Sequence, residues 1–129
     1  MLYLDSSAIV KLVLTEAESD ALHVYLAEHS EHVSSKLAQV EVLRALRRAK
    51  KPPLALQHAQ RILSRMSLIG FGERTLAHAA SLEPPNLRSL DAIHLATALS
   101  LDGLDAVVTY DRRLADAAAD AGLTVASPA

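Results

Sequence analysis

The chain contains no cysteine and no tryptophan. The absence of cysteine excludes disulfide bonds and thiolate metal sites, and it is compatible with a reducing cytoplasm. The aromatic residues are one Phe and three Tyr. We therefore expect no aromatic platform on which single-stranded bases would stack.

Long hydrophobic runs and an excess of positive charge are also missing. No apolar run approaches the roughly 20 residues of a membrane-spanning helix, so we expect no membrane association. The N-terminus lacks a basic segment and a small-residue cleavage site, which predicts no signal peptide and a cytoplasmic location. The formal net charge is -2, so any binding of nucleic acid must depend on a local surface.

The residues that are present favour one compact domain spanning residues 1–129, because half of them are hydrophobic. Short apolar runs alternate with segments of helical periodicity. The expected strands are 2–4, 32–34, 68–72, 106–109 and 123–125, and the expected helices are 8–14, 19–28, 37–50, 54–66, 73–82, 90–101 and 112–121. This alternation predicts an α/β fold, a three-layer α/β/α sandwich with a central, mostly parallel sheet.

Four carboxylates lie where apolar and polar segments meet. Asp5 and Asp111 follow predicted strands, Asp91 opens the helix 90–101, and Glu41 lies within the helix 37–50. Ligands of open parallel sheets bind beyond the carboxyl ends of the strands, so Asp5, Asp91 and Asp111 are expected to share a crevice. Clustered carboxylates need a divalent cation or raised pKa values. Hard cations such as Mg²⁺ take oxygen ligands, which is the chemistry of phosphodiester cleavage.

Each acid also has a purely structural explanation. Asp5 and Asp111 can cap the helices that follow them. Asp91 suits the first turn of a helix, and Glu41 can pair with Arg44 three residues on. However, Asp5 and Asp91 are enclosed by apolar neighbours, where an unpaired carboxylate is costly.

Several polar neighbours allow two interpretations. His94 lies three residues after Asp91, and we favour a packed histidine with satisfied nitrogens over a group at the edge of the site. Thr109 can hydrogen-bond a carboxylate or serve only as a strand residue. Ser6 and Ser7 can cap a helix or support the site.

The basic residues cluster in the middle of the chain. They are Arg44, Arg47, Arg48, Lys50 and Lys51, with Arg61 and Arg65 on the next predicted helix. A solvent-exposed face is the default interpretation. Because Glu41 opens the same helix, the alternative is a patch that borders the acidic pocket and holds a phosphate backbone.

Three segments together resemble PIN-domain proteins. They are residues 1–8 (MLYLDSSA), 90–98 (LDAIHLATA) and 107–114 (VVTYDRRL), the last followed by 121–125 (AGLTV). The resemblance covers essentially the whole chain and is nearest to VapC-type toxins of bacterial toxin–antitoxin pairs. The region 50–87 matches only in helical character, so substrate recognition there does not transfer.

The resemblance implies a Mg²⁺- or Mn²⁺-dependent endoribonuclease that cleaves RNA, and a homodimer inhibited by a cognate VapB-like antitoxin. By position, it assigns the family's four acids to Asp5, Glu41, Asp91 and Asp111. Asp5 and Asp91 are expected to hold Mg²⁺ most directly, and the other two acids through water or a second ion. Ser6 and Thr109 are the expected supports.

Two alternatives keep the fold and change the function. One is a PIN-fold nuclease that acts on another nucleic acid without an antitoxin. The other is a non-catalytic module that dimerises and holds an antitoxin through the apolar faces of the helices 8–14 and 54–66.

Overall fold

The computed structural model describes residues 1–129 and contains five strands and seven helices. The strands are β1 (Leu2–Leu4), β2 (His32–Ser35), β3 (Ser67–Ile69), β4 (Ala106–Val108) and β5 (Val125–Ala126). The helices are α1 (Ser6–Val13), α2 (Ser19–Ala27), α3 (Leu37–Arg48), α4 (Pro53–Ser64), α5 (Glu73–Ser81), α6 (Ser89–Leu99) and α7 (Arg112–Asp120). None of the helices has the length and hydrophobicity needed to cross a membrane.

The strands form one sheet in the order β3-β2-β1-β4-β5, and every neighbouring pair is parallel. The expected mostly parallel sheet is therefore parallel throughout. Leu4 at the end of β1 is in register with Val108 at the end of β4. The residues that directly follow these two strands consequently emerge side by side at the carboxyl edge of the sheet.

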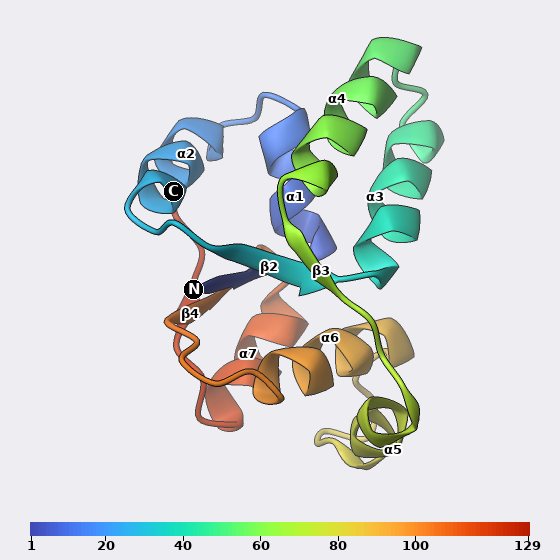
Figure 1. Cartoon of the computed structure of the whole chain (residues 1–129), viewed down its shortest axis with the longest axis vertical. Coiled ribbons are helices and arrows are strands. Elements are labelled where there is room, and N and C mark those ends of the chain that lie inside the picture. The colour runs from blue at the N-terminus through green and yellow to red at the C-terminus, as the bar shows by residue number, and fades with distance from the viewer.

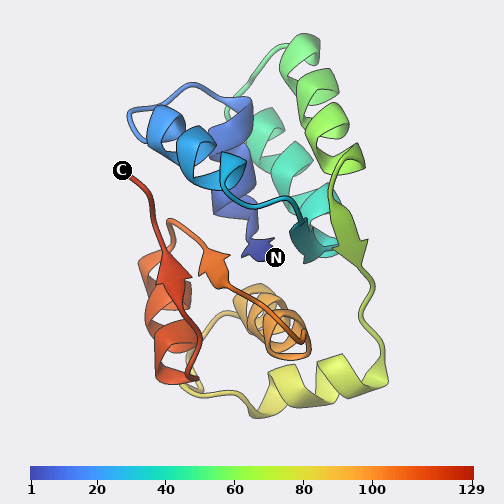
Figure 2. The same cartoon turned by 60° about the vertical axis from the view of Figure 1, so that its left-hand side comes forward.

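The helices cover both faces of the sheet, as the three-layer prediction requires. Figure 1 shows α1 to α4 on one side and α5 to α7 on the other, and Figure 2 shows the same separation after a 60° turn. The central strand serves both layers because its side chains alternate. Leu2 and Leu4 belong to the core under α1 to α4, while Tyr3 packs with Val107 and Ala98 on the opposite face.

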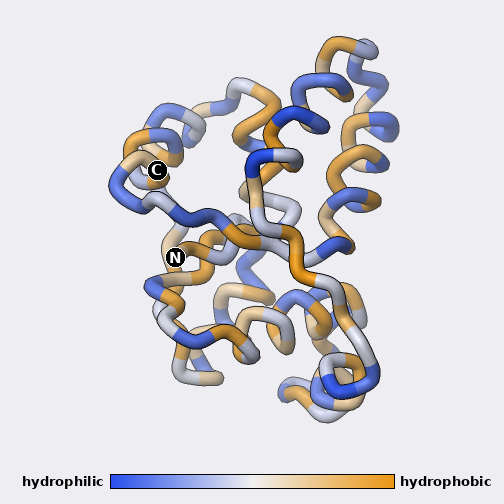
Figure 3. The backbone as a smooth tube through the Cα atoms, in the orientation of Figure 1, coloured by the Kyte–Doolittle hydropathy of each residue, from blue (hydrophilic) through white to orange (hydrophobic).

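Hydrophobic patterning explains how these layers form. Figure 3 shows hydrophobic stretches along the strands and two-coloured helices, with their polar sides outward. On α3, Ala38, Val42 and Leu46 recur at helical spacing and are fully buried. The helix is thus fixed to the sheet along one side, and its other sides are left for polar residues.

Backbone conformation sets the limits of several helices. α4 begins with Pro53 in its first turn, where the missing amide proton costs no hydrogen bond. After α7, Gly122 adopts a φ of 92°, a left-handed conformation that favours glycine and ends the helix. The observed helix bounds lie within about two residues of the expected ones, which is the usual uncertainty at helix ends.

We predict that Leu46→Ala lowers the free energy of unfolding by about 3 kcal/mol, because it leaves a cavity under α3. Leu46 is fully buried, whereas Leu54 on α4 is 72% exposed and serves as the matched control. Urea denaturation of both variants measures the difference. An equal loss for Leu54→Ala would contradict the assignment of the core.

Candidate functional site

Asp5 is a buried carboxylate at the end of the central strand, with 4% of its surface exposed. Its Oδ1 accepts hydrogen bonds from the Ala8 amide at 3.0 Å and from the Ser7 hydroxyl at 2.6 Å. Its Oδ2 accepts one from the Thr109 hydroxyl at 2.6 Å. Burial raises the pKa of Asp5, and these three hydrogen bonds oppose the increase. Asp5 therefore caps α1, as one interpretation predicted, and it also faces the end of β4.

The segment after β4 is joined to Asp5 by the same hydroxyls. Thr109 Oγ1 accepts the Asp111 amide at 3.0 Å, and Ser7 Oγ accepts the Tyr110 amide at 2.9 Å. Asp111 then caps α7, because its Oδ1 accepts the amides of Arg113 and Leu114. The turns that follow β1 and β4 are thus held in one hydrogen-bonded arrangement.

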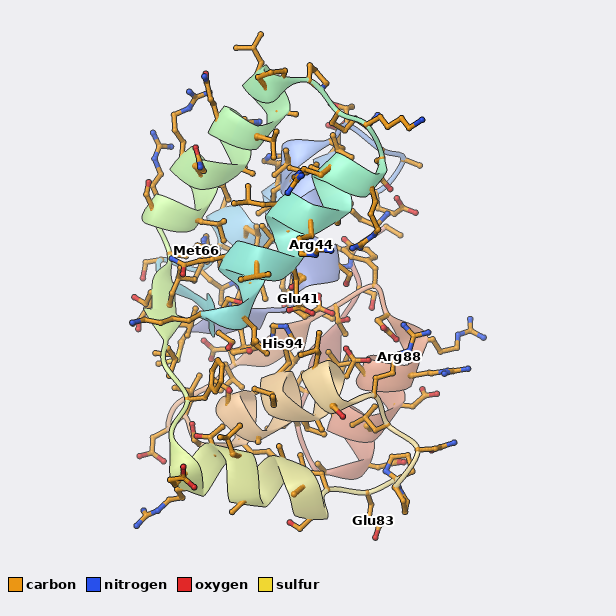
Figure 4. All side chains as sticks on the ribbon, turned by 90° about the vertical axis from the view of Figure 1, so that its right-hand side faces the viewer. Glu41, Arg44, Met66, Glu83, Arg88 and His94 are labelled. Carbon is orange, nitrogen blue, oxygen red and sulfur yellow. The ribbon has the colours of Figure 1, made fainter.

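Glu41 is held by two donors from other parts of the chain. Its Oε1 accepts the Ser6 hydroxyl at 2.7 Å and His94 Nε2 at 2.6 Å. Figure 4 shows Glu41 and His94 meeting between α3 and α6. The alternative that Glu41 pairs with Arg44 is wrong: no such ion pair forms, because the carboxylate is bound to Ser6 and His94.

His94 is almost fully buried, and both of its ring nitrogens are bonded. Nδ1 lies 2.6 Å from the Tyr3 hydroxyl, and the two rings meet edge-on. Burial, together with the nearby charges of Asp5 and Glu41, raises the pKa of Tyr3, so its hydroxyl keeps its proton. Nε2 carries the hydrogen that Glu41 accepts, because an ionised carboxylate has no proton to donate.

Asp91 differs from the other acids because its carboxylate receives no hydrogen bond from the protein. It lies half-buried in the first turn of α6. Burial and the charges of Asp111, Asp5 and Glu41 raise its pKa to about 6, while His94 opposes this increase. Asp91 therefore lies close enough to the other three acids for their charges to act on it.

The pKa of Glu41 shifts in the opposite direction to that of Asp91. Burial disfavours its charged form, but the hydrogen bond and charge of His94, with help from Ser6, outweigh burial and lower its pKa. Glu41 therefore remains ionised, whereas the charged form of Asp91 is disfavoured by its neighbours.

The oxygens left free by these hydrogen bonds determine what the site can hold. Both oxygens of Asp91, Oε2 of Glu41 and Oδ2 of Asp111 have no donor from the protein. No three Asp, Glu or His side chains converge closely enough to hold one metal ion between them. Mg²⁺ usually binds through one or two carboxylates and keeps several waters. The residues thus fit a hydrated hard cation and not a dry cage of protein ligands.

Two residues make contacts in this site that the sequence pattern did not specify. His94 is a packed histidine with both nitrogens bonded, as predicted, but it also bonds Glu41 directly. Its position three residues after Asp91 was the available signal. For Ser7, the sequence allowed either a helix cap or a support of the site. Its hydroxyl donates to Asp5 and accepts the Tyr110 amide, so it supports the site.

The chain is similar to known proteins along almost its whole length. The PIN-domain family profile matches residues 2–120. Ribonuclease VapC46 of Mycobacterium tuberculosis is 48% identical over 128 residues, which cover 98% of this chain and 97% of that protein.

Two solved structures share the fold. One is the M. tuberculosis toxin VapC20, described as cleaving the sarcin–ricin loop, with a TM-score of 0.77, 16% identity and coverage of 99% of this chain and 100% of the other. The other is a toxin–antitoxin complex from Klebsiella pneumoniae, with a TM-score of 0.74, 22% identity and coverage of 100% and 98%. The chain belongs to the PIN-domain family, in its VapC-type branch.

Proposed function

We propose that this protein is a divalent-metal-dependent endoribonuclease and the toxin of a VapBC-type toxin–antitoxin pair. The observation that carries the proposal is the acidic cluster around Asp91, whose carboxylate has no hydrogen bond from the protein and is affected by the charges of three other carboxylates. A relative that is 48% identical along almost the whole chain is named a ribonuclease, which supports RNA as the substrate. Since RNA is the proposed substrate, we place the protein's action in the cytoplasm.

Mg²⁺ is the proposed ion, with Mn²⁺ as an alternative. Asp91 offers two free oxygens and Asp5 retains lone pairs on Oδ2, so these two residues are the proposed direct ligands. Glu41 and Asp111 each offer one free oxygen, suited to contacts through water or to a second ion. When bound, the ion would lower the pKa of a water molecule and neutralise charge that develops on the phosphate.

The chain's own residues set the geometry of the reaction. Ser7 and Thr109 hold the carboxylate of Asp5 by hydrogen bonds. Ser6 and His94 both bond Oε1 of Glu41, so its Oε2 remains free to bind water. Hydrolysis forms a bond between a water oxygen and the RNA phosphorus, and it breaks the bond from phosphorus to one ribose oxygen. We propose that the carboxylate of Glu41, which stays ionised, orients the attacking water.

We further infer a homodimer and a cognate VapB-like antitoxin as partner. The Klebsiella neighbour is a toxin–antitoxin complex, and its fold similarity supports this choice of partner. Leu54 on α4 is 72% exposed and Val24 on α2 is 66% exposed, so apolar side chains are available for protein contacts.

Loss of either proposed direct ligand is expected to abolish cleavage. Asp5→Asn and Asp91→Asn each remove several kcal/mol of transition-state stabilisation, which corresponds to a loss of about 100-fold or more in rate. Cleavage of a labelled RNA with Mg²⁺ measures this, with the exposed Asp120→Asn on α7 as the matched control. Undiminished cleavage by both site variants would refute the assignment.

The raised pKa of Asp91 makes a prediction about stability. Between the ordinary value of 3.8 and about 6, the folded chain binds more protons than the unfolded chain, so the charge on Asp91 destabilises the fold above pH 6. Asp91→Asn is therefore expected to raise the free energy of unfolding at pH 7 by about 1 kcal/mol, after allowance for solvent screening. For a domain of this size the melting temperature rises by roughly 3 °C.

Thermal melts in EDTA at pH 7 and pH 4 test this directly. The gain should shrink at pH 4, where Asp91 is largely protonated in the folded protein. Added Mg²⁺ should stabilise the wild type and not Asp91→Asn. Asp120→Asn is the control for a general change in charge. An equal gain at both pH values would be inconsistent with the electrostatic origin.

The bond from His94 to Glu41 should matter for turnover more than for substrate binding. His94→Phe keeps an aromatic ring but removes the donor, and we expect kcat to fall by about 10-fold to 100-fold. His94→Gln, which restores an N–H donor, should recover part of the loss. Steady-state kinetics measures the change in kcat, and thermal melts show whether the variants are still folded. If His94→Gln is folded like His94→Phe but no faster, then Glu41 does not depend on this donor.

A further inference from the structure

α3 carries a group of three arginines in the turns that follow Glu41. Arg44, Arg47 and Arg48 alone line a surface hollow of about 250 Å³. We call these three residues the arginine hollow. The other basic residues in the middle of the chain, from Lys50 to Arg65, do not line it. The structure thus separates a small cluster from the broad basic patch seen in the sequence.

None of the three guanidinium groups has a carboxylate partner. The ion pairs of the chain involve the N-terminal amine, Lys11 and His94. Glu41 lies one turn before Arg44, but its Oε1 is bound to Ser6 and His94. Three unpaired cations on neighbouring turns repel one another, and a bound anion would relieve that repulsion.

The helix dipole explains only part of this cluster. Arg47 and Arg48 lie in the last turn of α3, where cations interact favourably with the helix carboxyl end. Arg44 lies a turn earlier, where this effect has faded. The helix dipole therefore does not account for Arg44.

The helix places the hollow in the turns that follow Glu41. Arg44 and Arg48 follow Glu41 by three and seven positions, so the three side chains share one side of α3. Their Cα atoms lie about 4.5 and 10.5 Å along the helix axis from that of Glu41. Figure 4 shows Arg44 on α3, next to the region where Glu41 and His94 meet. A nucleic-acid strand bound near Glu41 could therefore extend along the same side of α3 to the hollow.

We propose that the arginine hollow binds backbone phosphates of the RNA strand next to the bond that is cleaved. RNA as the ligand rests on the proposed function. The planar guanidinium matches phosphate oxygens with two parallel hydrogen bonds, which a lysine does not provide. The chain has a net charge of -2 and few aromatic residues, so RNA binding depends on such a local group of cations.

The test measures RNA binding separately from cleavage. Asp91→Asn serves as the parent, because the carboxylate of Asp91 makes no hydrogen bond with the protein and its replacement is expected to leave the fold intact. Arg44→Gln and Arg48→Gln are added to it singly and together. Arg61→Gln on α4 and Arg74→Gln on α5 are controls that remove the same charge elsewhere on the surface. Fluorescence anisotropy with a labelled single-stranded RNA in EDTA gives Kd over a range of salt concentrations.

Each hollow variant is expected to weaken RNA binding by about threefold to tenfold. The salt dependence should also become shallower, by about 0.7 in the slope of log K against log salt for each phosphate that is no longer neutralised. The Arg61→Gln and Arg74→Gln controls should keep both the affinity and the slope of the parent. If RNA binding depends on Arg44 and Arg48 but the wild-type protein cleaves no RNA with Mg²⁺, the hollow is upheld and the nuclease is rejected.

Two results would overturn the proposal. One is an equal loss of affinity in the hollow variants and the controls, because that loss would reflect overall charge. The other is unchanged RNA affinity together with weakened binding of poly-glutamate, which would identify the hollow as a binding site for an acidic protein segment.

Discussion

The buried carboxylate of Asp5 is the constraint on which the rest of the site depends. A charge at the end of the central strand, with 4% of its surface exposed, must be surrounded by donors. The donors come from the first turn of α1 and from Thr109 beyond β4. The pairing of Leu4 with Val108 brings Thr109 into place, and Thr109 in turn positions the amide of Asp111. One desolvated acid thus fixes the relative positions of two strand ends.

This arrangement makes the four carboxylates unequal. Asp5 accepts three hydrogen bonds and has little remaining freedom, whereas Asp91 accepts none and carries the repulsion of the other acids. Glu41 lies between these extremes, with one oxygen held by two donors and the other free. The opposite pKa shifts of Glu41 and Asp91 follow from this difference in hydrogen bonding, although both groups are about half-buried.

Local signals in the sequence predicted the fold and the location of Asp5 and Asp111 at one edge of the sheet. Apolar runs and helical spacing identified the elements, and parallel strands required Asp5 and Asp111 to emerge at one edge. The contact between Glu41 and His94 could not be predicted in this way, because it depends on how α3 and α6 meet across the sheet edge. Local spacing suggested a pair with Arg44, and tertiary packing replaced that partner with His94. Only the resemblance to PIN domains placed Glu41 with the other acids.

α3 connects these observations, because one rigid element carries both Glu41 and the arginine hollow. Val42 and Leu46 anchor the helix in the core, so the Cα atoms of Glu41 and of the three arginines keep a fixed separation. His94 connects the part of α3 that carries Glu41 to the opposite layer, because it bonds both Glu41 and Tyr3. A strand held by its phosphates on α3 would therefore lie in a defined position relative to the acids. Positioning the RNA in this way would lower the barrier to cleavage. This contribution would be important in a site that has few preformed metal ligands.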